Sequence, residues 1–239
     1  MTATAPGLVR LSLRELREIP YRAFRVAGAS HGEALHAAEA VQFAEVNGEG
    51  GIAAAVSSAT AGWAVDGLTP TRTRGPESIV FDIGSAGPVD LLQMGAALVE
   101  LASCTDLPAT VRLRASEMNA TIDHALCLAA VRTGRTAFAA QQAGSQVRVR
   151  AATPEGDLGQ DLREGTEGLL EGLEEGGTVI ATSRLAASAL IRADTRRPAA
   201  AFALHRADAA RNGVNVDDES WTAILRLASG YKQPDKEKS

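Results

Sequence analysis

The sequence predicts an α+β fold, or an irregular α/β fold, with a helical N-terminal third, a mixed sheet with helices, and a C-terminal helix. Apolar residues recur at helical spacing through residues 1–69, whereas short apolar or alternating runs between turn residues fill residues 78–231. The chain has no regular strand–helix repeat and no internal period. We expect residues 1–69 and 78–231 to form one compact unit, and the polar residues 232–239 to be disordered.

The first predicted helix spans residues 13–27, where the apolar side chains fall on one face. Ser12 and Glu15 form a capping box, in which the serine oxygen accepts from the third helical amide and the glutamate reaches back to the cap. Pro20 interrupts the pattern, so we expect a kink or a helix in two parts.

Two more helices are expected in the N-terminal third. One runs over residues 31–47 and ends at the glycines of residues 48–51. The other is an alanine-rich helix over residues 52–65. Because few aromatic residues are present, this part of the core must be built from alanine, leucine, valine and isoleucine.

The middle of the chain alternates between strand and helix patterns after a connector of turn residues. The expected elements are the connector at 69–78, strands at 78–84 and 109–115, helices at 87–104 and 116–134, and two strands within 136–152. Pro88 is expected at the first helical position of its helix.

The C-terminal part begins with an acidic, glycine-rich segment, residues 153–177, that we expect to be a loop with at most a weak helix. Three apolar runs then indicate buried strands, at 177–183, 186–194 and 199–207. The last helix is predicted at 219–231, capped by one of the two aspartates that precede it.

Composition and charge exclude several classes of partner. The net charge is −5 and the arginines are scattered, so nucleic acid and anionic membranes are not expected as partners. The chain has no apolar run long enough to span a bilayer and no leader pattern, so we expect a cytoplasmic protein. Cys104 and Cys127 are interpreted as buried structural thiols.

The tripeptide Ser30-His31-Gly32 has the residue types of a catalytic motif. Together with Glu33, however, it also forms a capping box at the start of the second helix. We favour the capping interpretation and keep His31 as an outside candidate for acid–base chemistry.

The second group of candidates lies where a strand gives way to a helix, a place where α/β layers often bind ligands. Arg114, Ser116 and Asn119 are predicted to bind a carboxylate or phosphate. On one continuous helix, Glu117 and His124 would share a face at a spacing of seven residues, so they are the candidate catalytic pair.

The chain lacks the spacings that mark other kinds of site. It contains no metal-binding cluster of histidine, cysteine and carboxylate residues, no nucleophile elbow, no phosphate-binding P-loop and no dinucleotide-binding glycine motif after a strand. We therefore predict no metal and no resident cofactor from these patterns.

Two stretches resemble an uncharacterised bacterial family, a domain of unknown function of similar length. Members of that family begin with a Ser-Leu-x-Glu helix, present here at residues 12–15. They close on a G-V-x-V-D-x-x-x-W helix, present here at residues 213–221. This resemblance implies a fold and no activity.

Both ends also resemble, more weakly, the second type of malate/lactate dehydrogenase, the family that includes ureidoglycolate dehydrogenase. Those enzymes carry an A-D-x-x-G-x-x-S-H-G motif whose histidine is the acid–base group. The matching segment here is AEVNGEGGIA, residues 44–53, in which Ala44, Glu45 and Gly48 agree with the motif. Ile52 stands at the histidine position and cannot transfer a proton.

These observations lead to three functional hypotheses. The first is a small metabolic protein that binds an anionic small molecule or a partner subunit, related to dehydrogenases but without their catalytic histidine. The second is an oxidoreductase that uses NAD(P) on a 2-oxo or 2-hydroxy acid, with the histidine supplied elsewhere. The third is a non-catalytic assembly partner. The alanine-rich helices are compatible with a homodimer.

Overall fold

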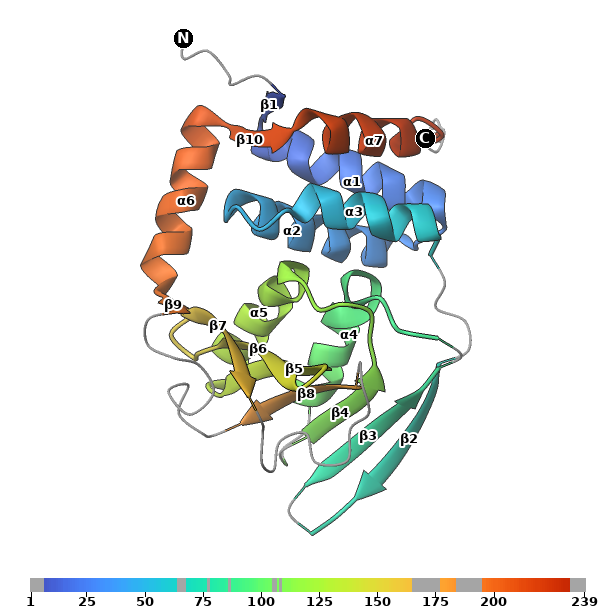
Figure 1. Ribbon diagram of the computed structural model, residues 1–239, viewed down its shortest axis with the longest axis vertical. Coiled ribbons are helices and arrows are strands. Elements are labelled where there is room, and N and C mark those ends of the chain that lie inside the picture. The colour runs from blue at the N-terminus through green and yellow to red at the C-terminus, as the bar shows by residue number, and fades with distance from the viewer. Residues whose placement is uncertain are drawn as a thin grey trace, which may run out of the picture. The chain divides into compact units, whose positions relative to one another are not determined.

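A computed structural model describes residues 7–63, 68–76, 78–85, 87–104, 107, 109–164, 177–183 and 195–232. Contacts between residues divide the chain into two compact units. The first unit comprises residues 1–64 together with 208–239, and the second comprises residues 65–207. Figure 1 shows the order of the helices and strands along the chain.

The first unit packs four helices and a small two-stranded ribbon. The helices are α1 (Leu13–Ala27), α2 (His31–Val46), α3 (Gly51–Ala61) and α7 (Asp218–Ala228). The ribbon pairs β1 (Leu8–Leu11) with β10 (Val214–Asp217) in antiparallel register. Helix α1 packs against α2 and α7, and α3 packs against α2 and α7, as Figure 1 shows. Leu16, Phe24, Val41, Ile52 and Ile224 are almost fully buried in this unit.

The capping predictions for this unit are confirmed. Ser12 with Glu15 and Ser30 with Glu33 each form both hydrogen bonds of a capping box. Asp217 caps α7 by accepting from the Ser220 amide. The expected two-part first helix is not formed, because α1 is one continuous helix through Pro20.

Helix α7 groups with the N-terminal helices, whereas the sequence pattern placed it with residues 78–231. Trp221 and Ile224 are buried on the side of α7 that packs against α1 and α3. The neighbouring strand β10 hydrogen-bonds to β1 near the start of the chain. Both contacts join elements near opposite ends of the described chain or far apart in it, and local periodicity carries no information about such contacts.

In the described residues, the second unit is built on a mixed sheet of eight strands. Its order is β2-β3-β4-β8-β5-β6-β7-β9. The strands are β2 (Thr69–Arg74), β3 (Ile79–Gly84), β4 (Ala109–Arg114), β5 (Thr136–Ala143), β6 (Gln146–Ala152), β7 (Leu158–Glu164), β8 (Gly177–Ser183) and β9 (Arg196–Arg197). Strands β3 and β4 are parallel, and the other adjacent pairs are antiparallel.

Two helices of this unit lie on one face of the sheet (Figure 1). Helix α4 (Leu91–Ser103) joins the parallel strands β3 and β4 and packs on β4 and β8. Helix α5 (Asp123–Thr133) follows a short 3₁₀ turn at Ala120–Ile122 and packs on β5 and β6. The opposite face of β5, β6 and β8 carries a second buried apolar set that includes Phe138, Val149 and Val179.

The predicted α+β class is confirmed, but two elements of the prediction are wrong. Residues 199–207 belong to helix α6 (Ala199–Asn212) and not to a strand. Their alanines favour helix, and of the residues in α6 only Ala209 is buried, so the apolar run did not mark a buried strand. Residues 69–74 form the exposed edge strand β2, where Pro70 is tolerated, and not a connector.

Two helix starts also differ from the prediction. Helix α4 is capped by Asp90 and begins after Pro88, which therefore is not its first residue. The predicted helix over residues 116–134 is helical only from Ala120 onward. Within the acidic segment, residues 158–164 form the strand β7 and not the expected loop. Residues 165–176 of that segment and the strand predicted at 186–194 lie outside the described residues.

None of the helices in the described part of the chain combines the length and the apolar composition needed to cross a bilayer.

Gly51 is expected to be indispensable to the crossing of α2 and α3. A Cβ at this position would lie 2.2 Å from the Val41 carbonyl oxygen and 3.0 Å from the Glu45 nitrogen. Gly51→Ala should lower the free energy of unfolding by about 1–3 kcal/mol or more, because backbone atoms must move apart. Urea unfolding followed by circular dichroism measures the change.

The matched control for this substitution is Gly32→Ala on α2. A Cβ at Gly32 meets nothing within 4 Å. This variant should be as stable as the wild type or gain roughly 0.5–1 kcal/mol from helix propensity. Equal stability of the Gly51→Ala variant and the wild type would contradict the close approach.

Candidate functional site

The loop of residues 115–119 follows the parallel strand β4 and lies beside the segment that leads into α4. The Val89 amide donates to the Arg114 carbonyl at 2.8 Å, and the Ser116 amide donates to the Val89 carbonyl at 2.8 Å. These two bonds extend the parallel β3–β4 arrangement past the end of the strands. The loop is therefore located at the carboxyl edge of the parallel pair, where open sheets commonly bind ligands.

The side chain of Gln141 on β5 forms hydrogen bonds with the backbone of this loop. This side chain is 4% exposed, and its Oε1 accepts from the Met118 amide at 2.8 Å. Its Nε2 donates to the carbonyls of Ser116 at 2.7 Å and Ala115 at 3.4 Å, and to the Thr178 hydroxyl at 3.2 Å. One buried amide thus satisfies backbone groups of Ala115, Ser116 and Met118, which fixes the course of the loop.

A buried ion pair holds the first turn of α5 to β6. Arg150 donates from Nε and Nη2 to the two carboxylate oxygens of Asp123, each at 2.6 Å. The Arg150 and Asp123 side chains are 6% and 1% exposed. Arg150 also donates from Nη1 to the Gln160 side chain at 2.9 Å. Because the pair is bidentate and supported by a further hydrogen bond, it orients α5 on the sheet.

The predicted binding residues all lie on or beside this loop. Arg114 is exposed at the last position of β4, and Ser116 is half-buried. The Asn119 side-chain oxygen accepts from the amide and the hydroxyl of Thr121 and caps the 3₁₀ turn. Asn119 therefore offers its amide hydrogens, and not its oxygen, to a ligand.

The predicted acid–base pair of Glu117 and His124 rested on a shared helical face, and that premise is wrong. Glu117 is in the loop, whereas His124 is half-buried in the first turn of α5. Because Glu117 is not on the helix, the seven-residue spacing does not place it on the same face as His124. Glu117 instead forms an ion pair with Arg148, at 2.8 Å from its Nη1.

His31 lies in the first unit, at the exposed start of α2. The Tyr21 hydroxyl is 2.9 Å from His31 Nδ1, and the two rings meet edge to face. Tyr21 also contacts the Tyr231 ring in the same manner. Burial raises the pKa of Tyr21, and the hydrogen bond with Tyr231 adds to the rise.

The segment that matches the dehydrogenase motif forms the turn between α2 and α3. Glu45 accepts from the Ile52 amide at 2.7 Å, and so supplies the cap that Gly50 lacks. Ile52 is 1% exposed and belongs to the apolar core of the first unit. In the structure the position of the family's histidine is therefore occupied by a packed aliphatic side chain.

The two cysteines differ in environment. Cys104 is exposed, so its predicted burial is wrong. Cys127 is half-buried on α5, and burial, together with the nearby Asp123 carboxylate, raises the pKa of its thiol to about 12. Because the thiolate is the nucleophilic form, this raised pKa disfavours a nucleophilic role for Cys127 near neutral pH.

Sequence reasoning missed Gln141, Arg148 and Arg150. The sequence predicted a strand over these two arginines but did not assign which face of it would be buried. In the structure the face of β6 that carries both arginines is covered by α5, and Arg150 is buried there. The signal that was present is weak: Asp123 opens a helix and can pair with an arginine, but the sequence does not say which one.

No protein-family model matches the chain, and no curated protein matches its sequence. The expected membership of an uncharacterised bacterial family therefore has no support.

Solved structures of similar fold are dehydrogenases and a reductase. The malate dehydrogenase of Pyrococcus horikoshii OT3 superposes with a TM-score of 0.66 and 12% identity, over 98% of this chain and 99% of that one. The sulfolactate dehydrogenase of Methanocaldococcus jannaschii gives 0.60 and 10%, over 92% and 96%. The delta1-piperideine-2-carboxylate reductase of Pseudomonas syringae gives 0.55 and 14%, over 92% and 99%. At this identity the likeness is one of fold: the chain has the malate/lactate dehydrogenase-type fold.

Glu45 is expected to make stability depend on pH. Burial raises the pKa of its carboxyl above the ordinary value, the Asp217 charge adds to the rise, and the amides of Ile52 and Gly51 oppose it. The folded state therefore holds the proton to higher pH than the unfolded state does. As pH rises from the ordinary glutamate range through the raised pKa, the free energy of unfolding should fall.

Glu45→Gln imitates the protonated form and still accepts the Ile52 amide. The variant should lose this part of the pH dependence and match or exceed the stability of the wild type at neutral pH. Urea unfolding at a series of pH values tests it, with Glu39→Gln on the same helix as the control for loss of one charge. A Glu45→Gln profile parallel to that of the wild type would refute the assignment.

Proposed function

We propose that this protein is an oxidoreductase that interconverts a small 2-oxo acid and the corresponding 2-hydroxy acid with NAD(P). The observation that carries the proposal is the similarity of fold, over nearly the whole chain, to malate and sulfolactate dehydrogenases. Malate and sulfolactate are both 2-hydroxy acids. Because one fold can carry different activities, the proposal also rests on the residues at the loop after β4.

In this proposal the loop after β4 and the start of α5 hold the substrate. Ser116 offers a hydroxyl and Asn119 its amide hydrogens. Arg114, by contrast, is on the sheet face opposite Arg148 and α5. His124 gives a proton to the substrate oxygen while C2 receives a hydride, so that a 2-oxo acid plus hydride plus proton gives a 2-hydroxy acid. NAD(P)H, when bound, supplies the hydride.

Near this loop, the phosphates of NAD(P) would be bound by cationic side chains and not by the start of helix α4. Asp90 accepts from the Leu92 amide at 2.8 Å, so a carboxylate already occupies the start of α4. A pyrophosphate on that helix start would meet this negative charge. The exposed guanidinium of Arg114, on the sheet face opposite α5, is a cation at this edge that fits a phosphate oxygen.

A second candidate function is binding of a small carboxylate without redox chemistry. The buried Ile52 favours it, because an isoleucine in the core cannot serve as the acid–base group at the position where the related family has its histidine. Both candidate functions involve binding of a small carboxylate, and only the oxidoreductase converts it to a product.

Turnover assays distinguish the two candidates. The full chain is mixed with NADH or NADPH and with pyruvate, oxaloacetate or sulfopyruvate, and the absorbance of the reduced nicotinamide is followed. The oxidoreductase proposal expects turnover with at least one pair. His124→Gln should then lower kcat by about a hundredfold or more. His36→Gln, at an exposed position on α2, should leave kcat unchanged.

Absence of turnover with every pair, together with no rise in melting temperature on adding either nucleotide, would overturn the oxidoreductase proposal. A rise with the carboxylates alone would then favour the second candidate. Turnover that is insensitive to His124→Gln would remove this histidine from the reaction.

A further inference from the structure

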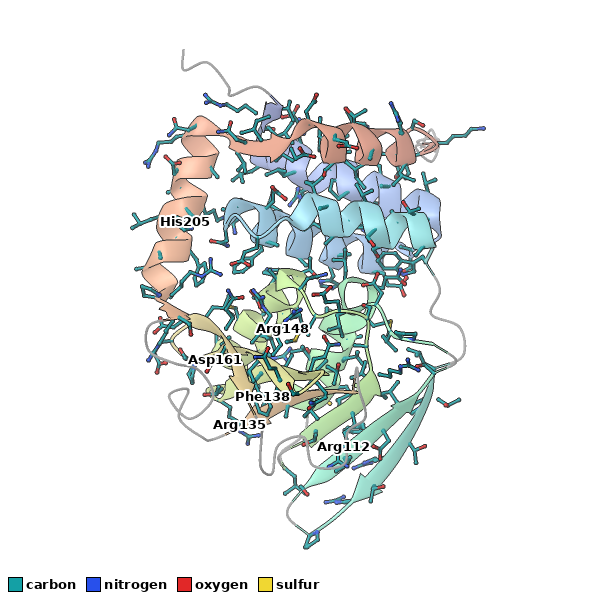
Figure 2. All side chains as sticks on the ribbon, viewed as in Figure 1. Arg112, Arg135, Phe138, Arg148, Asp161 and His205 are labelled. Atoms are coloured by element: carbon teal, nitrogen blue, oxygen red, sulfur yellow. The ribbon has the colours of Figure 1, made fainter. Side chains whose placement is uncertain are left out.

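We propose that Arg148 is the carboxylate receptor of the site, a residue that determines which small anions bind; this inference rests on the proposed function in its choice of ligand. Arg148 is on β6, on the same face of the strand as Arg150. It lies far in the sequence from the loop of residues 115–119, whose backbone it contacts. Figure 2 labels its side chain.

The Arg148 guanidinium is anchored through a single nitrogen. Its Nη1 donates to Glu117 Oε1 at 2.8 Å and to the Met118 carbonyl at 3.1 Å. Within the part of the chain that the structure describes, Nε and Nη2 donate to no protein atom. These two nitrogens form the edge of a guanidinium that matches the two oxygens of a carboxylate.

The contrast with Arg150 shows why this open edge matters. Arg150 is buried and uses all three of its nitrogens on Asp123 and Gln160. Its role is structural. The Arg148 side chain is 34% exposed, so a ligand from solvent can reach it. Of these two arginines on one face of β6, Arg150 uses all of its nitrogens in hydrogen bonds. Arg148 leaves Nε and Nη2 without a protein partner among the described residues.

The anchor that orients Arg148 is itself rigid. Its carbonyl partner belongs to Met118, which is 2% exposed, and the Met118 amide is held by the buried Gln141 side chain. A preorganised guanidinium loses less conformational entropy when it binds an anion than a free surface arginine does. The same anchor holds Arg148 against Glu117 and Met118 of the loop that we propose to hold the substrate.

Glu117 competes with the ligand for the Arg148 charge. Its side chain is 79% exposed, and ion pairs with exposed partners contribute little. An incoming carboxylate can therefore share the guanidinium or displace Glu117 at small cost. Without the Glu117 charge, the site should bind anions more tightly.

The test is calorimetric titration of the full chain with malate, and separately with acetate and with inorganic phosphate. We expect the wild type to bind malate. Arg148→Met should weaken malate binding by about tenfold or more, through loss of charge-assisted hydrogen bonds. Arg148→Lys keeps the positive charge without the paired guanidinium donors, so its malate affinity should lie between those of the wild type and Arg148→Met. Glu117→Gln should bind malate more tightly than the wild type.

Arg112→Met is the matched control. Arg112 is an exposed arginine of β4 on the opposite face of the sheet, and Figure 2 labels it for comparison with Arg148. This variant should keep the malate affinity of the wild type, and the melting temperatures of all variants report whether they fold. If Arg148→Met fails to fold, Arg148→Lys and Glu117→Gln still give opposite shifts in malate affinity.

Malate affinity that is unchanged in Arg148→Met, or a wild type that binds no malate, would overturn the proposal. Binding of phosphate but not malate in an Arg148-dependent manner would overturn the carboxylate assignment. Arg148-dependent malate binding without turnover on any nicotinamide pair would refute the proposed function and leave this inference standing. Turnover insensitive to Arg148→Met would refute this inference and leave the proposed function standing.

Discussion

The buried Gln141 side chain is the interaction on which the candidate site depends. A loop that carries Ser116, Glu117 and Met118 would otherwise present unpaired backbone groups to a closed interior, which is costly. The glutamine amide supplies a donor and an acceptor from a position that the sheet already fixes. The loop course, the direction of Arg148 and the start of α5 follow from that fixed point and from the Asp123–Arg150 pair.

The sheet supplies these groups from the face that the helices cover. Strands β5 and β6 carry Gln141, Arg148 and Arg150 on the side covered by α5. A hydrophobic layer alone would pack α5 without selecting its rotation or the course of the preceding loop. Directional bonds from a rigid sheet select both, which is the kind of support that a binding site on a loop requires.

Local patterns in the sequence predicted local structure well. The capping boxes at Ser12 and Ser30, the cap at Asp217 and the strands around residues 143–144 depend on neighbours within a few residues. The failures are non-local. The apolar run in α6 was predicted to be a buried strand, and the faces of β6 were not assigned, because burial is decided by distant elements. The candidate loop could be predicted because a strand-to-helix junction is visible in a short stretch of sequence. Gln141 and Arg148 contact this loop from other strands, and no short sequence pattern indicates such contacts.

Hydrogen exchange at the Met118 amide tests the central claim most directly, because this amide donates to Gln141 and to no helix or strand ladder. In the wild type it should be protected. Gln141→Leu should speed its exchange by about tenfold or more, since a buried hydrogen bond is lost. Gln142→Leu alters the neighbouring residue, whose side chain bonds to the Gly144 carbonyl, and should leave the Met118 amide protected. Equal protection of the Met118 amide in the wild type and in Gln141→Leu would contradict the account.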